Sequence, residues 1–340
     1  MSKSSFQNEF KRIVSLIREH ERFLILGHVD PDGDCIGSIL ALTQYLITAG
    51  KDVRCYAPGE IPEVYEQLPC FDRFVTEGEL SGFDSEVIFS LDVPTPRRTA
   101  DLAGSRSELV VVNIDHHPTN ENFGAINIVD ETAGATAVLV YRLLADIDPE
   151  GITSGIADCL FVGILLDTGG FRFQNSDAEV FATAAKLIEH GARAYELTHE
   201  FIHAKKFNAL KLLALALDSL RIHSGGRIAT MEISMDMLAR SGGFLRDTEG
   251  FIDYAGAIDH VELCALFREI TPDQVRVSLR SRNDYDVAEL AEQYGGGGHR
   301  NAAGLVMNID LEAAKSRIIQ DLEKLTERMD SNKEAVQGSE

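Results

Sequence analysis

Short apolar segments alternate with longer stretches of helical spacing through the first half of the chain, and this alternation limits the fold more than any other feature. Segments with the length and β-branched content of buried strands cover residues 22–30, 52–57, 85–93 and 108–117. Stretches with apolar residues at helical spacing cover residues 35–50, 135–147 and 156–171. Strands and helices in alternation are typical of α/β proteins, so we predict a doubly wound, mainly parallel sheet.

The second half of the chain has a different pattern. Residues 177–226 are largely helical in character, and strand-like segments return at 227–235, 261–270 and 274–281 before a last helix at 311–329. A chain of 340 residues exceeds the usual size of a single core, which stops growing near ~250–300 residues. We therefore predict an α/β domain over residues 1–187, a helical connector over 188–220, a smaller α/β domain over 221–330 and a disordered tail over 331–340.

Carboxylates and imidazoles gather where segments of the first half end. In chain order they are His28, Asp30, Asp32 and Asp34 in "GHVDPDGD", Asp92 in "SLDV", Asp115, His116 and His117 in "NIDHH", and Asp167 in "LLDTGGF". An isolated Asp at such a position is usually a turn or cap residue, and Asp30 before Pro31 fits that alternative. We read the four places as strand ends, and ligands bind outside the carboxyl ends of the strands of such a sheet. The four places are therefore predicted to converge on one site.

These side chains have the chemistry of a metal centre. Several carboxylates and imidazoles together would repel one another if empty, and mixed oxygen and imidazole ligands suit Mn²⁺ or a similar divalent cation. The number of ligands is sufficient for two ions, which at a separation of ~3.5–4 Å clamp a phosphoryl group and convert a water molecule to hydroxide. Hydrolysis of a phosphate ester is the predicted reaction, with Asp115 either a ligand or a residue that orients one.

A run of four glycines marks the second half, in "QYGGGGHRNAAG" at residues 293–304. Glycines let the backbone approach a bound group closely, and the small residues after His299 and Arg300 indicate a helix N-terminus or a tight turn. We interpret the segment as a phosphate or nucleotide cradle, with a flexible linker as the alternative.

The strand-like segment before the glycine run alternates in polarity. Arg276, Ser278 and Arg280 are expected on one face of this strand, opposite its apolar residues. Arg280 can reach a phosphate with its bidentate guanidinium, whereas Arg276 is interpreted as part of a solvated face.

Charge and cysteine usage limit the partners and the compartment. A net charge of −22 argues against binding long nucleic acid, because that mode needs a basic stripe. The five cysteines are scattered without CxxC spacing, which is typical of reduced cytoplasmic thiols. No stretch approaches the ~18 apolar residues of a membrane span, and the N-terminus lacks the apolar core of a signal peptide. We expect a cytoplasmic protein with no membrane partner.

The segment "HEFIH", His199 to His203, matches the HExxH pattern of zinc metalloproteases. Such short patterns occur by chance, and the sequence signals no third ligand. We therefore expect a helix face without a metal here, and we keep the protease as a weak alternative.

The motifs "HVDPDGD", "LDV", "DHH", "LLDTGGF" and "GGGGHRNAAG" together resemble the DHH phosphoesterase family in its DHH–DHHA1 form, and within it the oligoribonucleases and 3′-phosphoadenosine 5′-phosphate (pAp) phosphatases. The resemblance covers residues 15–325. It implies that His28 and Asp32 bind one metal ion, that Asp34, His116 and Asp167 bind another, and that Asp92 bridges the two.

The resemblance also implies roles in binding and catalysis. His117 would contact the phosphate and stabilise the leaving oxygen, Asp115 would support it, and Arg98 matches a family arginine loosely. In the second domain the expected substrate-binding residues are Arg280, Ser281, Gly296, Gly297, Gly298 and His299.

The activity implied is metal-dependent hydrolysis, with two divalent ions, of oligoribonucleotides of about two to five nucleotides to mononucleotides, and of pAp to AMP. Mn²⁺ is the expected metal, with Mg²⁺ or Co²⁺ possible, and the connector offers an apolar face for a homodimer. The alternatives are a linear or cyclic dinucleotide phosphodiesterase, a family II pyrophosphatase and a non-catalytic nucleotide sensor. The glycine run disfavours the pyrophosphatase, and the full set of ligands disfavours the sensor.

Overall fold

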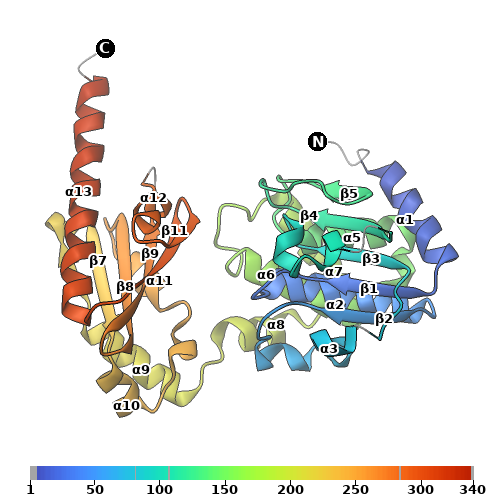
Figure 1. The fold of residues 1–340 in the computed structure, drawn as a ribbon, viewed down its shortest axis with the longest axis horizontal. Coiled ribbons are helices and arrows are strands. Elements are labelled where there is room, and N and C mark those ends of the chain that lie inside the picture. Colours follow the sequence, from blue (N-terminus) through green and yellow to red (C-terminus); the bar gives the residue numbers. More distant parts are fainter. Residues whose placement is uncertain (1–5, 81, 106–107, 283–284, 338–340) are drawn as a thin grey trace. The chain divides into compact units, whose positions relative to one another are not determined.

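Five parallel strands in the order β2-β1-β3-β4-β5 form the sheet of the first half of the chain (Figure 1). The strands are β1 (Arg22–Leu26), β2 (Asp52–Tyr56), β3 (Val87–Leu91), β4 (Val110–Asp115) and β5 (Ile126–Val129). The first four lie within the segments expected to be strands, whereas β5 was not expected. Because the chain leaves β1 for β2 on one side and β3 pairs with β1 on the other, the strand order reverses between β1 and β3.

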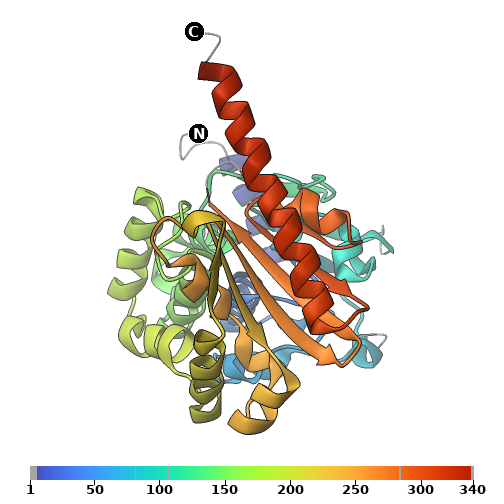
Figure 2. The ribbon, with the colours of Figure 1, turned by 90° about the vertical axis from the view of Figure 1, so that its left-hand side faces the viewer.

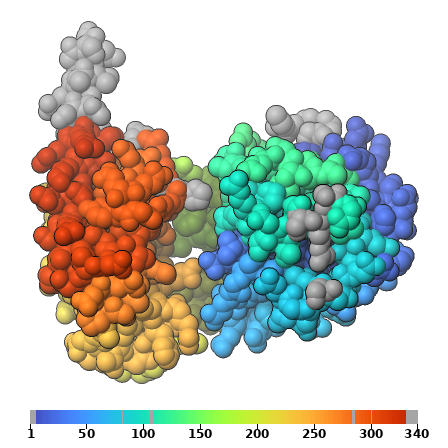
Figure 3. All heavy atoms as spheres, viewed as in Figure 1, coloured from blue at the N-terminus to red at the C-terminus, as the bar shows by residue number. Residues whose placement is uncertain are grey.

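Helices cover both faces of this sheet, so the doubly wound α/β prediction is confirmed. One face, with Phe23 and Phe89, packs against the larger helices, and the other, with Leu24 and Ile88, packs against two short ones. The larger helices are α1 (Gln7–Glu19), α2 (Gly33–Thr48), α5 (Thr136–Ile147), α6 (Ser154–Asp167) and α7 (Ala178–Glu189), and the short ones are α3 (Glu77–Leu80) and α4 (Leu102–Ser105). In the space-filling view α1, in dark blue, forms one side of this half (Figure 3).

Helices α2 and α6 cross at two glycines. A Cβ atom at Gly37 would overlap the carbonyl oxygen of Cys159, and a Cβ at Gly163 would lie 2.8 Å from Cβ of Ala137 and 3.0 Å from Oδ1 of Asp34. The missing side chains therefore let the helix backbones approach closely, which brings the first turn of α2 near the last turn of α6.

The computed structural model describes residues 6–80, 82–105, 108–282 and 285–337. The chain divides into two units, Met1–Ala204 and Lys205–Glu340, and the boundary falls inside the segment expected to be a connector. That segment contains α8 (Ala194–Thr198), a π-helical turn (His199–His203) and α9 (Phe207–Asp218). None of the helices in the described ranges combines the length and apolar character needed to cross a bilayer.

A six-stranded sheet in the order β10-β11-β9-β8-β7-β6 forms the second unit. Its strands are β6 (Arg221–His223), β7 (Ile228–Ile233), β8 (Leu263–Thr271), β9 (Gln274–Ser281), β10 (Gly297–His299) and β11 (Ala302–Met307). Only β7 and β8 pair in parallel, and the other neighbours in this sheet are antiparallel.

Two groups of helices cover the second sheet. One face, with Phe267 and Val277, packs against α12 (Val287–Glu292) and α13 (Leu311–Gln337), and Figure 2 shows α13 lying across the strands. The opposite face packs against α9, α10 (Met235–Ser241) and α11 (Phe251–Gly256). Helix α13 continues beyond Asp330 to Gln337, so the predicted disordered tail differs from the structure over residues 331–337, and residues 338–340 lie outside the described chain.

Candidate metal centre

The carboxyl ends of three neighbouring strands place imidazoles and a carboxylate at one edge of the first sheet. His28 follows β1, Asp92 follows β3, and His116 and His117 follow β4. Strands β1 and β3 flank the point where the strand order reverses, and this is where open α/β sheets bind ligands. The structure brings these residues close together, as the distances between their side chains show.

Asp92 lies at the centre of the cluster and is fully buried. Its Oδ2 lies 3.5 Å from Nε2 of His28, and its Oδ1 lies 3.8 Å from Nε2 of His116 and 3.6 Å from Nδ1 of His117. The residue has a left-handed backbone with φ of 61°, which Asp tolerates better than most side chains. The hydroxyl of Thr136 donates a hydrogen bond of 2.9 Å to Oδ1, so the carboxylate is held between the histidines.

Helix α2 brings two more carboxylates to the same place. Asp32 caps the helix by accepting hydrogen bonds of 3.1 Å from the backbone N–H groups of Asp34 and Cys35, and its Oδ1 lies 3.8 Å from Nε2 of His28. Asp34 is buried and accepts hydrogen bonds from the first turn of α5, at 2.6 Å from Thr136 N–H and 2.9 Å from Ala137 N–H. Its Oδ2 lies 3.9 Å from Nε2 of His116.

Asp167 joins the cluster from a helix and not from a strand. The prediction of a fourth strand end here is wrong, because Asp167 is the last residue of α6. Its Oδ2 lies 3.9 Å from Nε2 of His116, and the side-chain amide of Asn175 donates a hydrogen bond of 3.1 Å to the same oxygen. The glycine contact between α2 and α6 brings this helix end to the site.

Hydrogen bonds to backbone carbonyls turn two imidazoles toward the carboxylates. Nδ1 of His28 lies 2.8 Å from the carbonyl oxygen of Val29, and Nδ1 of His116 lies 3.1 Å from that of Ala133. A ring nitrogen that donates to a carbonyl leaves the lone pair of Nε2 free, and this is the usual arrangement of a histidine that binds a metal. Both Nε2 atoms point into the cluster.

His117 is oriented in the opposite way. Its Nδ1 donates to Oδ1 of the fully buried Asp115 at 2.7 Å, and Asn120 donates to the second oxygen of Asp115 at 2.6 Å. Nε2 of His117 makes no hydrogen bond to any protein atom within the described residues. Asp115 therefore fixes the orientation of the ring and leaves Nε2 of His117 without a protein partner among the described residues.

Crowding of the carboxylates changes their acidity. Burial, together with the charges of Asp92 and Asp167, raises the pKa of Asp34 well above its usual value. Burial raises the pKa of Asp167 to about 6, with the charge of Asp92 adding to the effect and His116 opposing it. Burial opposes protonation of His28, but the carboxylates of Asp32 and Asp92 outweigh it and raise its pKa to about 10. Without a cation the cluster therefore retains protons to offset its own charge.

The donor set fits divalent cations. The ligand atoms of Asp34, His116 and Asp167 lie within 4.8 Å of one another, as do those of Asp92, His116 and His117. His28 and Asp92 form a third group with Cys35, but burial raises the pKa of that thiol, which leaves it protonated and a poor ligand. Carboxylate oxygens and imidazole nitrogens without thiolate favour ions such as Mn²⁺ or Mg²⁺.

Comparison with known proteins gives the family. The model of the DHH family N-terminal domain matches residues 22–164, and that of the DHHA1 domain matches residues 242–327. The bifunctional oligoribonuclease and PAP phosphatase NrnA of Thermus thermophilus is 34% identical over 306 residues, which cover 89% of this chain and 90% of that protein. The chain belongs to the DHH–DHHA1 family.

Other relatives of this DHH–DHHA1 protein align with nearly the whole chain. NrnA of Bacillus subtilis, with the same description, is 27% identical over 94% of this chain and 98% of its own length. The crystal structure of an exopolyphosphatase-related protein from Bacteroides fragilis matches with a TM-score of 0.88 at 25% identity, covering 95% of this chain and 98% of that one.

Arg98 of the DHH unit lies at the edge of the cluster. The residue is half-buried in a short helical turn (Pro96–Thr99) after β3, and its Nη2 lies 3.2 Å from Nδ1 of His28. Burial and the positive charge of Arg98 lower the pKa of His117, but the hydrogen bond to Asp115 and the charges of Asp92 and Asp115 outweigh them and raise it. Arg98 therefore places a cationic group beside His28, at the edge of the cluster.

The glycine run of the DHHA1 unit forms a β-hairpin. Strands β10 and β11 pair in antiparallel fashion across a turn at residues 300–301, so the tight turn is found and the helix N-terminus is not. A Cβ at Gly296 would overlap the carbonyl of Gly304, and Gly298 has φ of 149°. These two glycines are therefore required by the hairpin itself, while nothing lies within 4 Å of a Cβ at Gly297. The side chain of His299 is outside the described part.

The other residues expected to bind substrate lie on β9. Arg280 is half-buried and is opposite Ala302 of the hairpin in the strand register. The hydroxyl of Ser281 donates to the carbonyl of Tyr285 at 2.9 Å and accepts a hydrogen bond from the Asn301 side chain at 3.0 Å. Ser281 therefore ties the strand to the turn of the hairpin.

The HExxH segment is not associated with the cluster. His199, Glu200 and His203 are exposed on a π-helical turn, while Phe201 between them packs against Tyr65 with ring centroids 5.5 Å apart. Among the described residues, the groups of side chains close enough to share an ion do not include these three.

Several residues that hold the site carry no pattern in the sequence. Thr136 and Asn175 hold carboxylates of Asp92 and Asp167, and Asn113 and Asn120 lie behind Asp115. Each is a single polar residue in an ordinary segment, and only the folded arrangement connects it to the site.

Proposed function

We propose that the chain is a metal-dependent phosphoesterase that hydrolyses short oligoribonucleotides to mononucleotides and removes the 3′-phosphate of pAp. The observation that carries the proposal is the sharing of the buried Asp92 carboxylate between His28 and His116, each with Nε2 directed toward it. We take the two substrates from the names of the Thermus and Bacillus relatives. Transfer of these substrates to this chain is supported by alignments that cover both of its domains.

The ligand groups divide naturally into two sets around Asp92. We assign His28, Asp32 and Asp92 to one divalent ion, and Asp34, His116, Asp167 and Asp92 to the other, with Mn²⁺ preferred over Mg²⁺ and Co²⁺. Bound there, the two ions would supply positive charge to the phosphoryl oxygens and lower the pKa of a water molecule. Support for this division comes from the distances of 3.5 to 3.9 Å that separate the carboxylate oxygens from the two Nε2 atoms.

The other residues act on the substrate directly. His117 donates a proton from Nε2 to the leaving oxygen, while Asp115 and Asn120 hold its ring in place. Arg98 adds positive charge beside His117 and draws the phosphate toward this edge. In the DHHA1 unit we assign Arg280, Ser281 and the glycine hairpin, with Gly296, Gly297, Gly298 and His299, to holding the remainder of the nucleotide.

We also propose a cytoplasmic location, a preference for short oligonucleotides and a homodimer. All five cysteines are unpaired, which fits a reducing cytoplasm. The net charge of −22 favours short oligonucleotides over long nucleic acid, because a long duplex needs many basic contacts. A homodimer is proposed from the exposed side chains of Phe207 and Leu210 on α9, and the mass in solution would test it.

Product analysis tests the activity. The purified chain with Mn²⁺ is given RNA dimers to pentamers, pAp, a cyclic dinucleotide and inorganic pyrophosphate in parallel, with Asp92→Asn and chelator controls. Mononucleotides from the short RNAs and AMP from pAp, with little cleavage of pyrophosphate, are the expected result. Cleavage of pyrophosphate alone, of the cyclic dinucleotide alone, or none at all would overturn the proposal.

A further inference from the structure

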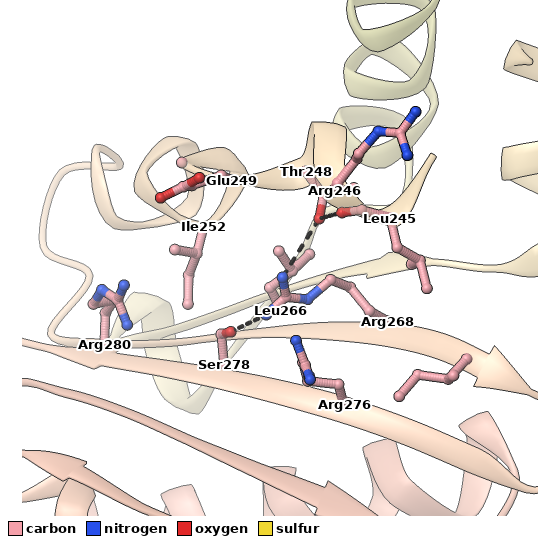
Figure 4. A pocket seen from close by; sticks show the side chains of 12 residues that line it. Leu245, Arg246, Thr248, Glu249, Ile252, Leu266, Arg268, Arg276, Ser278 and Arg280 are labelled. Atoms are coloured by element: carbon pink, nitrogen blue, oxygen red, sulfur yellow. Dashed lines mark hydrogen bonds between the residues drawn. The ribbon is translucent and has the colours of Figure 1, made fainter. Parts of the chain in front are cut away.

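One face of the second sheet is only partly covered by helices. Helices α9 and α11 pack against residues of β7 and β8 on this face, and their apolar cluster stops there. The neighbouring strand β9 presents Arg276, Ser278 and Arg280 on the same side, over which lies a cavity of about 580 Å³. Figure 4 shows these side chains, with Arg268 of β8, projecting from the sheet into the cavity.

Like charges face one another at the floor of this cavity. Arg268 is directly opposite Arg276 in the antiparallel register, a placement that destabilises a sheet. Burial and the charges of Arg276 and Arg280 lower the pKa of Arg268, and the exposed Glu249 only partly opposes them. Across the described ranges, no carboxylate oxygen lies within 4.0 Å of any of the three guanidinium groups. Within the described ranges the three guanidinium groups therefore have no carboxylate in an ion pair with them.

Arg268 is nevertheless held in place. Its Nη1 lies 3.4 Å from the hydroxyl of Thr248, and its Nη2 donates to the hydroxyl of Ser278. Its Nε is buried and has no hydrogen-bond partner in the described structure. A buried donor without a partner costs free energy, so both the charge and the donor of this side chain favour an anion in the cavity.

The remaining walls indicate what carries the anion. Leu245 and Ile252 lie across the cavity from the strands, with Ile252 above Ser278 in Figure 4, and Leu266 of β8 adds an apolar side chain to the floor. A cavity of about 580 Å³ is in the range of small-molecule sites and is far larger than a phosphate ion requires. Guanidinium pairs bind phosphate in bidentate fashion, and apolar walls suit a nucleoside.

We propose that this cavity binds a nucleoside monophosphate, with Arg268 and Arg276 on its phosphate and the apolar wall against its nucleoside. Arg268 and Arg276 are distinct from Arg280, which is the arginine of this face that the family resemblance assigns to substrate binding. The choice of a nucleotide as ligand rests on the proposed function, but the binding itself requires neither a metal nor hydrolysis.

Equilibrium binding to the full-length chain in chelator tests the site without turnover. AMP, adenosine and inorganic phosphate are titrated by calorimetry against the unaltered protein, Arg268→Gln, Arg276→Gln and the control Arg240→Gln. Arg240 is an exposed residue of α10 that pairs with Asp236 and lies outside the cavity. We expect AMP to bind more tightly than adenosine or phosphate, with each cavity variant weakening AMP about tenfold or more and the control leaving it unchanged.

Thermal unfolding separates loss of binding from loss of folding. Removal of one positive charge by Arg276→Gln is expected to raise the melting temperature of the ligand-free protein by about 1–3 °C and to abolish its increase with AMP. Phosphate binding as tightly as AMP, or AMP affinity that is the same in both cavity variants and the control, would overturn the proposal. Failure of the hydrolysis assay with AMP binding retained would instead count against the proposed function alone.

Discussion

Oδ1 of Asp115 lies 2.7 Å from Nδ1 of His117, and this contact decides which ring nitrogen is left without a protein partner. Burial of Asp115 raises the pKa of its carboxyl group, but the hydrogen bonds from His117 and Asn120 together with the charge of His117 outweigh burial and lower it. The ionised carboxylate holds the proton on Nδ1, and it also raises the pKa of His117. The arrangement is the same as in catalytic triads, where a buried carboxylate orients an imidazole by accepting a hydrogen bond from Nδ1.

Replacing Asp115 by Asn tests this orientation. The amide keeps the shape but removes the negative charge, so we expect kcat on pAp to fall about 10²-fold or more because proton donation by His117 is impaired. Metal affinity, measured by calorimetry, should change little because Asp115 faces His117. The double variant Asp115→Asn/His117→Ala should be no slower than His117→Ala alone. Multiplicative losses in the double variant would mean that the two residues act separately.

Asp92→Asn is predicted to be the most damaging single change in the metal centre. One oxygen becomes an amide nitrogen, so the shared contact to His28 and His116 is lost and turnover should fall by at least about 10³-fold. Elemental analysis of the variant after dialysis should show fewer bound ions. His199→Ala serves as the control, since that exposed side chain lies outside the cluster and its loss should leave both activity and metal content intact. The reverse pattern would contradict the site as assigned.

The parts of the site that follow strands could be predicted from the sequence. His28, Asp92 and His116 each lie within two residues of the end of an apolar strand, and parallel topology alone brings such positions to one edge. Asp167 shows the limit of that reasoning, since a carboxylate at the end of a buried helix has the same local pattern as one at the end of a strand. Its position depends on how two helices cross.

Long-range contacts explain the other differences. Thr136 is bonded to Asp92 from 44 residues away in sequence, and no local pattern marks such a partner. The glycine run was expected to begin a helix or to form a tight turn, and only the strand register reveals the hairpin whose close pairing requires Gly296 and Gly298. Arg276 is exposed, as the alternating pattern of the strand indicated, but the sequence does not show that Arg268 lies opposite it.

Gly163→Ala tests the helix crossing that brings Asp34 and Asp167 together. The new Cβ would lie 3.0 Å from Oδ1 of Asp34 and 2.8 Å from Cβ of Ala137, both inside a packed region. We expect a loss of about 1–3 kcal/mol in the free energy of unfolding and weaker metal binding, because Asp34 must move. Gly78→Ala is the matched control, since nothing lies within 4 Å of its Cβ. Denaturant unfolding and metal titration of both variants measure the difference, and equal behaviour would exclude the close contact.

Metal binding is predicted to release protons. In the metal-free protein the carboxylates of Asp32 and Asp92 raise the pKa of His28 to about 10, so its imidazole is protonated at pH 7, whereas a ligand must be neutral. Apparent affinity for the ion that His28 binds should therefore rise with pH by about tenfold per unit through neutrality, because His28 loses one proton. The raised pKa of Asp34 adds a dependence in the same direction for the other ion. Below about pH 6, Asp167 is protonated as well, and the dependence should become steeper.

Calorimetry in buffers of different ionisation enthalpy counts these protons directly. The expected count is at least one at pH 7.5 and larger at pH 5.5, and it should fall by about one at pH 7.5 in His28→Gln, which has no imidazole to deprotonate. The same pKa shift also makes the stability of the metal-free protein depend on pH. The raised pKa of His28 stabilises the metal-free fold at low pH, and this contribution declines as the pH rises from the unfolded value of about 6.5 and is lost through about 10. A heat of binding independent of the buffer would show that the carboxylates do not hold a proton on His28.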